Sequence, residues 1–251
     1  MNTSRLYVFR FSHFCEKVLW ARDHLNVNVE TVYLLPGLHT RHVQKLSDQT
    51  AVPILTSSNK AILGSTAILE HWANSADFSR DVPGDAIAWA ERADLLGPAI
   101  RGALFEHLLT KPAAAARLFT ASKGIKGWSY AGFMRLTAPM LKRRIQANAD
   151  TIDSGLAELP MFLQDIAQAT ENTGYLIGDQ FSLADLAVAA MLFPLSFPPE
   201  SGHTIPVELA QTMDGWIARW STHPAIAWVN QVYAMHRQPN PGSNNVASRS
   251  I

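Results

Sequence analysis

Only one cysteine occurs among the 251 residues, so an internal disulfide is excluded and a reducing, cytoplasmic setting is expected. The chain also lacks a charge bias, because its 21 Lys and Arg residues equal its 21 Asp and Glu residues. No basic block therefore provides the phosphate-neutralising surface that nucleic-acid binding needs. The first residues, MNTSRLYVFRF, contain no long apolar run of the kind found in signal peptides and membrane spans. We expect neither nucleic acid nor a membrane as a partner.

The chain has enough apolar residues to form a buried core, since 47% of its residues are hydrophobic. In residues 5–11 and 27–35, β-branched and aromatic residues predict two strands. Between them, residues 14–25 place apolar side chains at helical spacing. The chain is therefore predicted to begin with a strand, a helix and a second strand.

A second group of elements is predicted before residue 75. VPIL at 52–55 and KAIL at 60–63 flank the turn-rich TSSN and indicate an antiparallel hairpin. Ser65 is a favoured N-cap for the helical pattern TAILEHWAN that follows. Residues 1–74 are thus predicted to form an α/β domain of the order βαβ-ββα.

From about residue 84 the strand signals end and helical periodicity takes over. Residues 75–84 are predicted to be a linker, residues 85–237 an all-helical domain, and residues 238–251 a mobile tail. Ser182 and Asp185 have the spacing of a capping box. Helices are predicted in the 84–109 region and at 129–150, 154–170, 182–193, 206–221 and 224–236. Pro139 is expected to kink the helix predicted at 129–150 or to end its first segment.

Four segments, in this order and at these separations, resemble the glutathione S-transferase family. They are FSHFCEKVLWA at 11–21, AVPIL at 51–55, LGSTAILEHW at 63–72 and YLIGDQFSLADLAVAA at 175–190. The resemblance covers roughly residues 5–237. It implies a thioredoxin-like N-terminal domain that binds glutathione, followed by an all-helical domain.

The first motif contains three candidate reactive residues, Ser12, His13 and Cys15. Ser12 has two interpretations: it caps a helix, or its hydroxyl stabilises the thiolate of glutathione at the positive end of that helix. Cys15 is the alternative catalytic residue, although lone cysteines are more often buried, and we favour burial. His13 has no carboxylate at motif spacing to complete a hydrolase triad.

The second and third motifs resemble the glutathione-binding segments of the family. The resemblance implies a cis peptide bond before Pro53, with Val52 as the backbone partner of glutathione; an ordinary trans proline in an edge strand is the alternative. Ser65 and Thr66, at the start of a helix, suit the γ-glutamyl carboxylate. The acidic residue that usually precedes this serine is Gly64 here, so the usual partner for the ligand's ammonium group is missing.

Two further groups of residues are candidates for the rest of the site. The loop GLHTRHVQK offers His39, with Arg41, His42 and Lys45 as alternatives, to hold the glycine carboxylate of glutathione. The segment GWSYAGFMRLTAPM offers an apolar pocket for a second substrate, although an aromatic stripe at this spacing is more often plain core. Its candidate pocket residues are Tyr130, Phe133 and Met134.

The resemblance implies an enzyme that activates the thiol of glutathione, its co-substrate, for attack on a small hydrophobic electrophile. It also implies a homodimer and no metal. Two alternatives stay open: a glutathione-dependent thiol reductase that uses Cys15, and a non-catalytic binding or scaffold protein built on the same fold. Gly64 is the main argument for the scaffold.

Overall fold

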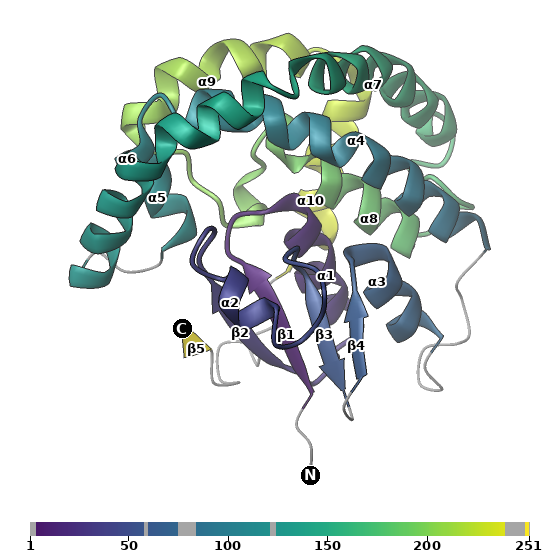
Figure 1. Cartoon of the computed structure of the whole chain (residues 1–251). Coiled ribbons are helices and arrows are strands. Elements are labelled where there is room, and N and C mark those ends of the chain that lie inside the picture. Colours follow the sequence, from purple (N-terminus) through teal and green to yellow (C-terminus); the bar gives the residue numbers. More distant parts are fainter. Residues whose placement is uncertain (1–3, 58–59, 75–83, 121–123, 239–248, 251) are drawn as a thin grey trace.

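The computed structural model of the chain describes residues 4–57, 60–74, 84–120, 124–238 and 249–250. Two halves are evident in Figure 1, a small sheet with its own helices below and an arch of long helices above. The fold is the predicted one, a thioredoxin-like N-terminal domain followed by an all-helical domain.

The N-terminal half follows the predicted order closely. Its sheet has the strand order β4-β3-β1-β2-β5, with β1 parallel to β2 and antiparallel to β3, and β3 antiparallel to β4. The predicted hairpin is therefore present, although the tip of its turn, 58–59, lies outside the described residues. The elements are β1 (Arg5–Phe9), α1 (His13–His24), β2 (Glu30–Leu34), α2 (Thr40–Val43), β3 (Ile54–Ser57), β4 (Lys60–Leu63) and α3 (Ser65–Ala73).

Side chains of β1 alternate between two buried clusters, as the period of a strand requires. Leu6 and Val8 belong to the large core that extends into the helical half. Tyr7 belongs to a small cluster on the opposite face, where it joins Val43 of α2 and Ile54 of β3. The sheet is thus buried on both faces, and this fixes the direction in which the turn after β1 leaves the sheet.

The helical half is organised around α8, all of whose residues are buried. Ser182 and Asp185 form the predicted capping box at its start, and Asp185 also accepts a hydrogen bond from the backbone N–H of Leu176 at 2.7 Å. The helices are α4 (Gly84–Leu108), α5 (Pro112–Phe119), α6 (Ile125–Gln146), α7 (Ala149–Thr170), α8 (Leu183–Leu192), α9 (Val207–Trp220) and α10 (Pro224–His236). Two short 3-10 turns, η1 (Phe193–Leu195) and η2 (Pro199–Ser201), follow α8.

Buried ion pairs join the two halves. Just after α10, the Arg237 guanidinium donates to Glu16 at 2.8 Å and to Asp23 at 2.9 Å, both on α1. The fully buried ammonium of Lys17, also on α1, donates to Asp94 on α4 at 2.5 Å. Helix α1 is therefore fixed to the helical half at two places.

The structure corrects two details of the sequence prediction. The N-cap of α3 is Gly64, so Ser65 is the first helical residue. Helix α6 does not end at Pro139 but continues through it. The predicted linker, 75–84, lies outside the described residues except for Gly84, which begins α4. Of the predicted tail, 239–248 and 251 also lie outside the described residues, and Arg249–Ser250 form β5 beside β2.

Candidate active site

Ser12 lies in the turn between β1 and α1, where the chain leaves the sheet. Its extended backbone (φ −171°, ψ 125°) makes it the N-cap of α1, and its Oγ accepts a hydrogen bond from the backbone N–H of Cys15 at 3.4 Å. This contact uses a lone pair of the oxygen. The hydroxyl also interacts with the Cys15 side chain, where its hydrogen bond partly offsets the burial that raises the pKa of the thiol. Ser12 thus caps the helix, and its hydroxyl would turn from Cys15 toward the cavity to donate to a ligand.

Cys15 is fully buried, as the sequence interpretation favoured. Its Sγ accepts a hydrogen bond from the backbone N–H of Phe9 at 3.3 Å. Burial raises the pKa of this thiol to about 12, so little thiolate is present at neutral pH. The geometry of Cys15 therefore gives no support to a thiol reductase that uses this residue.

The peptide bond between Val52 and Pro53 is cis, as the resemblance implied. The carbonyl of Pro53 accepts a hydrogen bond from the N–H of Gly64 at 3.2 Å, so this segment and the start of α3 are held together. Val52 lines the same cavity as Ser12.

The neighbours Ser65 and Thr66 have different environments at the start of α3. The Ser65 hydroxyl is buried and has no hydrogen-bond partner among the described residues. The Thr66 hydroxyl instead accepts from Lys17 Nζ at 2.7 Å and donates to Asp94 at 2.6 Å. Only Ser65 thus has an unused side-chain group for a ligand.

His39, the predicted partner of the glycine carboxylate, lines the cavity but has both ring nitrogens engaged. Nδ1 accepts from the backbone N–H of Gly37 at 3.1 Å, so Nε2 carries the proton and donates to the Thr50 carbonyl at 2.8 Å. Burial lowers the pKa of His39, which favours this neutral ring. The alternatives Arg41, His42 and Lys45 do not line the cavity.

The cavity has a volume of about 670 Å³ and lies between the two halves of the molecule. The N-terminal half contributes Ser12, Val52 and His39. The rest comes largely from α4, the second half of α6 and the start of α7. A cavity of this size is large enough for a tripeptide thiol or a small aromatic molecule.

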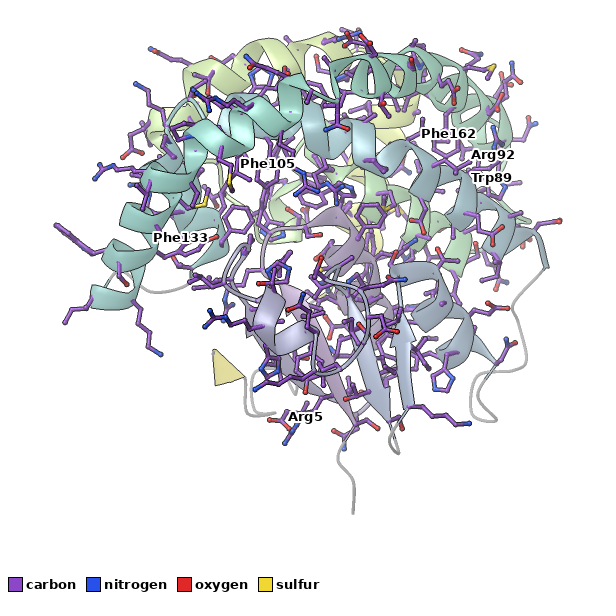
Figure 2. All side chains as sticks on the ribbon, in the orientation of Figure 1. Arg5, Trp89, Arg92, Phe105, Phe133 and Phe162 are labelled. Atoms are coloured by element: carbon purple, nitrogen blue, oxygen red, sulfur yellow. The ribbon has the colours of Figure 1, made fainter. Side chains whose placement is uncertain are left out.

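The predicted pocket residues are not part of its lining. Tyr130 and Met134 are buried in the core, and the Tyr130 hydroxyl donates to the carbonyl of Pro36 at 3.1 Å. Phe133 stacks on Tyr130 and lies over Gly37. Figure 2 shows Phe133 far out on α6, whereas Phe105 of α4, which does line the cavity, lies beneath the helical arch.

Sequence reasoning missed two charged residues of the cavity, Arg101 on α4 and Arg144 on α6. Arg101 follows the buried Ile100 by one position, so periodicity places it only at the edge of an apolar face. Arg144 ends the run Lys142, Arg143, Arg144, and nothing in the sequence distinguishes the three cations. Both residues line one cavity only because the tertiary structure packs α4 beside α6.

Comparison with known proteins agrees with this architecture. Residues 6–78 match the family model described as "Glutathione S-transferase, N-terminal domain". No curated protein sequence matches the chain at a significant level. Within the described residues, no helix combines the length and apolarity needed to cross a membrane, and no three metal-binding side chains gather as a metal site would require.

Solved structures similar to the chain include three with nearly complete coverage. A glutathione S-transferase from Methylobacillus flagellatus, solved with GSH bound, is 15% identical and covers 98% of this chain and 100% of its own, with a TM-score of 0.54. The β-etherase LigF of a Sphingobium species is 18% identical, with 91% and 99% covered and a TM-score of 0.55. The glutathione transferase GSTFuA3 from Phanerochaete chrysosporium is 14% identical, with 94% and 98% covered and a TM-score of 0.56. Residues 6–78 therefore match a glutathione S-transferase N-terminal domain, and the chain as a whole has the fold of the solved glutathione transferases.

Proposed function

We propose that this protein is an enzyme that binds glutathione against its N-terminal half and transfers it to a small electrophile held in the cavity. The observation that carries the proposal is Ser12, whose side chain lines the cavity at the start of α1 while its oxygen caps that helix. A hydroxyl that donates to sulfur favours the ionised thiol, and the helix terminus favours the same negative charge.

In the proposed reaction the thiol proton of glutathione leaves to solvent, and the Ser12 hydroxyl then donates to the resulting thiolate. The sulfur attacks the electrophilic carbon, forms a C–S bond and displaces the leaving group with its electron pair. A free thiol has a pKa of about 8.5, so lowering it toward neutrality increases the nucleophile at cellular pH.

The rest of glutathione is proposed to lie along the N-terminal half. The unpartnered hydroxyl of Ser65 and the first N–H groups of α3 suit the γ-glutamyl carboxylate. The backbone of Val52 is the proposed partner of the ligand's own peptide group. Thr66 contributes its backbone N–H only, because its hydroxyl is already bonded to Lys17 and Asp94.

A non-catalytic scaffold is the second candidate, and Gly64 is the observation that favours it. Where the family usually has an acid, this chain has no side chain to hold the ligand's ammonium, and the nearest acid on α3, Glu70, is exposed. Calorimetry separates the two candidates, because a scaffold would show no binding at millimolar glutathione.

Exposed apolar residues support a homodimer. Ile125, Trp128, Leu136 and Met140 of α6 are all exposed, and their spacings of three, eight and four residues bring them to one face of the helix. A symmetric partner would cover that face. Sedimentation at micromolar concentration tests this, and a particle of 27.6 kDa would contradict it. The single cysteine remains the reason for proposing a cytoplasmic location.

The catalytic role of Ser12 is tested by two substitutions that separate it from the capping role. Glycine is nearly as good an N-cap as serine but has no hydroxyl, whereas threonine keeps the hydroxyl. We expect Ser12→Gly to raise the pH at which bound glutathione ionises, measured by ultraviolet thiolate absorbance, and to lower kcat far more than glutathione affinity. Ser12→Thr should keep most of the activity. If bound glutathione ionises at the same pH in the parent and in Ser12→Gly, Ser12 only caps the helix and has no catalytic role.

A further inference from the structure

Two guanidinium groups line the helical side of the cavity. Arg101 comes from α4 and Arg144 from α6. Neither forms an ion pair with any described residue, and the lining contains no aspartate or glutamate. The cavity therefore has positive charge without a carboxylate to balance it.

Arg101 lines the cavity, and its side chain is also exposed to water. Partial burial lowers the pKa of Arg101, and the nearby charge of Arg144 lowers it further. Two like charges in a partly desolvated space repel one another, and their field is screened less than on an open surface. An anion placed between them would relieve that repulsion.

The remaining walls of the cavity are largely apolar and aromatic. Phe105 lies one helical turn from Arg101 on the same side of α4, and it lies beneath the arch of helices in Figure 2. The charge of Arg101 also acts near Ser12, because it helps to lower the pKa of His13, the residue next to Ser12. The aromatic rings that line the cavity are those of Phe9, Phe11, Phe14, Phe105, Phe119 and Phe193.

We infer that the electrophile taken by this cavity is an organic anion, with an aromatic or other apolar body and a carboxylate or sulfonate group that Arg101 and Arg144 bind. This inference rests on the proposed function and narrows its substrate class. A neutral hydrophobic electrophile would have to approach two guanidinium groups without offering them an acceptor, which is unfavourable. A carboxylate instead forms charge-assisted hydrogen bonds with them.

A matched pair of substrates isolates the contribution of charge. 4-Chloro-3,5-dinitrobenzoate and 4-chloro-3,5-dinitrobenzamide have the same ring and leaving group, and only the first is an anion. With either, the thiolate sulfur forms a bond to the carbon that carries chlorine, the C–Cl bond breaks, and chloride leaves with the electron pair. The thiol proton has already gone to solvent, so the products are the thioether, chloride and a proton.

We expect the parent to prefer the benzoate, measured as the ratio of the two kcat/KM values after each is divided by its uncatalysed rate. Arg101→Gln and Arg144→Gln should each lower that ratio about tenfold, equivalent to 1.4 kcal/mol, because the benzoate loses more than the benzamide. Arg143→Gln is the matched control, because Arg143 is the exposed neighbour of Arg144 and does not line the cavity. It should keep the parental ratio.

Calorimetry with 3,5-dinitrobenzoate and 3,5-dinitrobenzamide, which have no leaving group, separates the inference from the proposed function. Arginine-dependent binding of the benzoate, without conjugation of any substrate, would uphold the anion site and refute the transferase. Conjugation without preference for the benzoate would uphold the transferase and refute the anion site. The inference also fails if the two variants weaken glutathione binding alone, because the arginines would then belong to the glutathione site.

Discussion

His13 makes the stability of this protein sensitive to acid. It is the first residue of α1, next to Ser12, and only 3% of it is exposed. Its Nε2 has no hydrogen-bond partner among the described residues. Burial is the main reason why its pKa falls from the usual 6.5 to about 3, and the positive charges of Arg101 and Lys17 lower it further.

The direction of the effect follows from which state binds the proton. Between pH 6.5 and 3 the unfolded chain carries a proton on His13 and the folded protein does not. The free energy of unfolding therefore decreases as the pH falls through this range, by about 1.4 kcal/mol for each pH unit. From pH 6.5 to 4.5 the loss is about 2.3 kcal/mol, because the unfolded chain is only half protonated at pH 6.5, and this is a large part of the roughly 5–15 kcal/mol that stabilises a typical domain.

Urea unfolding at several pH values between 7.5 and 4.5 measures this contribution. His13→Asn removes the titrating group and keeps a short polar side chain, so its unfolding free energy should fall by about 2.3 kcal/mol less than that of the parent between pH 6.5 and 4.5. His71→Asn is the matched control, because His71 is exposed on α3. Parallel curves for the parent and His13→Asn, or an NMR titration of His13 near pH 6, would refute the reasoning.

Two further predictions concern the joint between the halves and the start of α3. Arg237→Met should lower the unfolding free energy, measured in urea, by about 3–5 kcal/mol, because buried Glu16 loses its guanidinium partner. Arg219→Met, on the exposed side of α9, is the control and should cost far less. Equal losses in the two variants would contradict this prediction. Gly64 has a φ of 89° and a ψ of 152°, a region reserved for glycine, so Gly64→Ala and Gly64→Glu should both cost about 1–3 kcal/mol of stability. Only the Glu variant should tighten glutathione binding in calorimetry, by about tenfold for each 1.4 kcal/mol. Equal affinities would mean that the ammonium is already satisfied or that glutathione is not the ligand.

Local patterns were sufficient for most of the fold. The β-branched and aromatic residues of 5–11 predicted β1, and the helical pattern of 182–193 with its capping box predicted α8. Helix α5 (Pro112–Phe119) was not predicted, because its eight residues are fewer than the window over which helical periodicity is recognised. Pro139 was expected to kink or end its helix, yet α6 continues through it.

The lining of the cavity was predicted only where it follows the chain locally. Ser12 and Val52 were singled out because each belongs to a short motif, and both line the cavity. Arg101 and Arg144 were not found, because their neighbourhood depends on how α4 packs beside α6. Tyr130 was assigned to the pocket on its aromatic character, yet the packing of α6 on the loop at Pro36 directs it into the core.

Ser65 and Thr66 show most clearly what tertiary contacts add to a sequence motif. Both have a hydroxyl at the start of one helix, so the motif alone does not show which of the two would donate to a ligand carboxylate. Lys17, 49 positions before Thr66, and Asp94, 28 positions after it, engage the Thr66 hydroxyl on both sides. Because a buried hydroxyl without a partner is costly and a bonded one is not, the hydroxyl left over at Ser65 is the one that a ligand can stabilise. The choice between two adjacent residues is thus decided by an ion pair that spans both halves of the molecule.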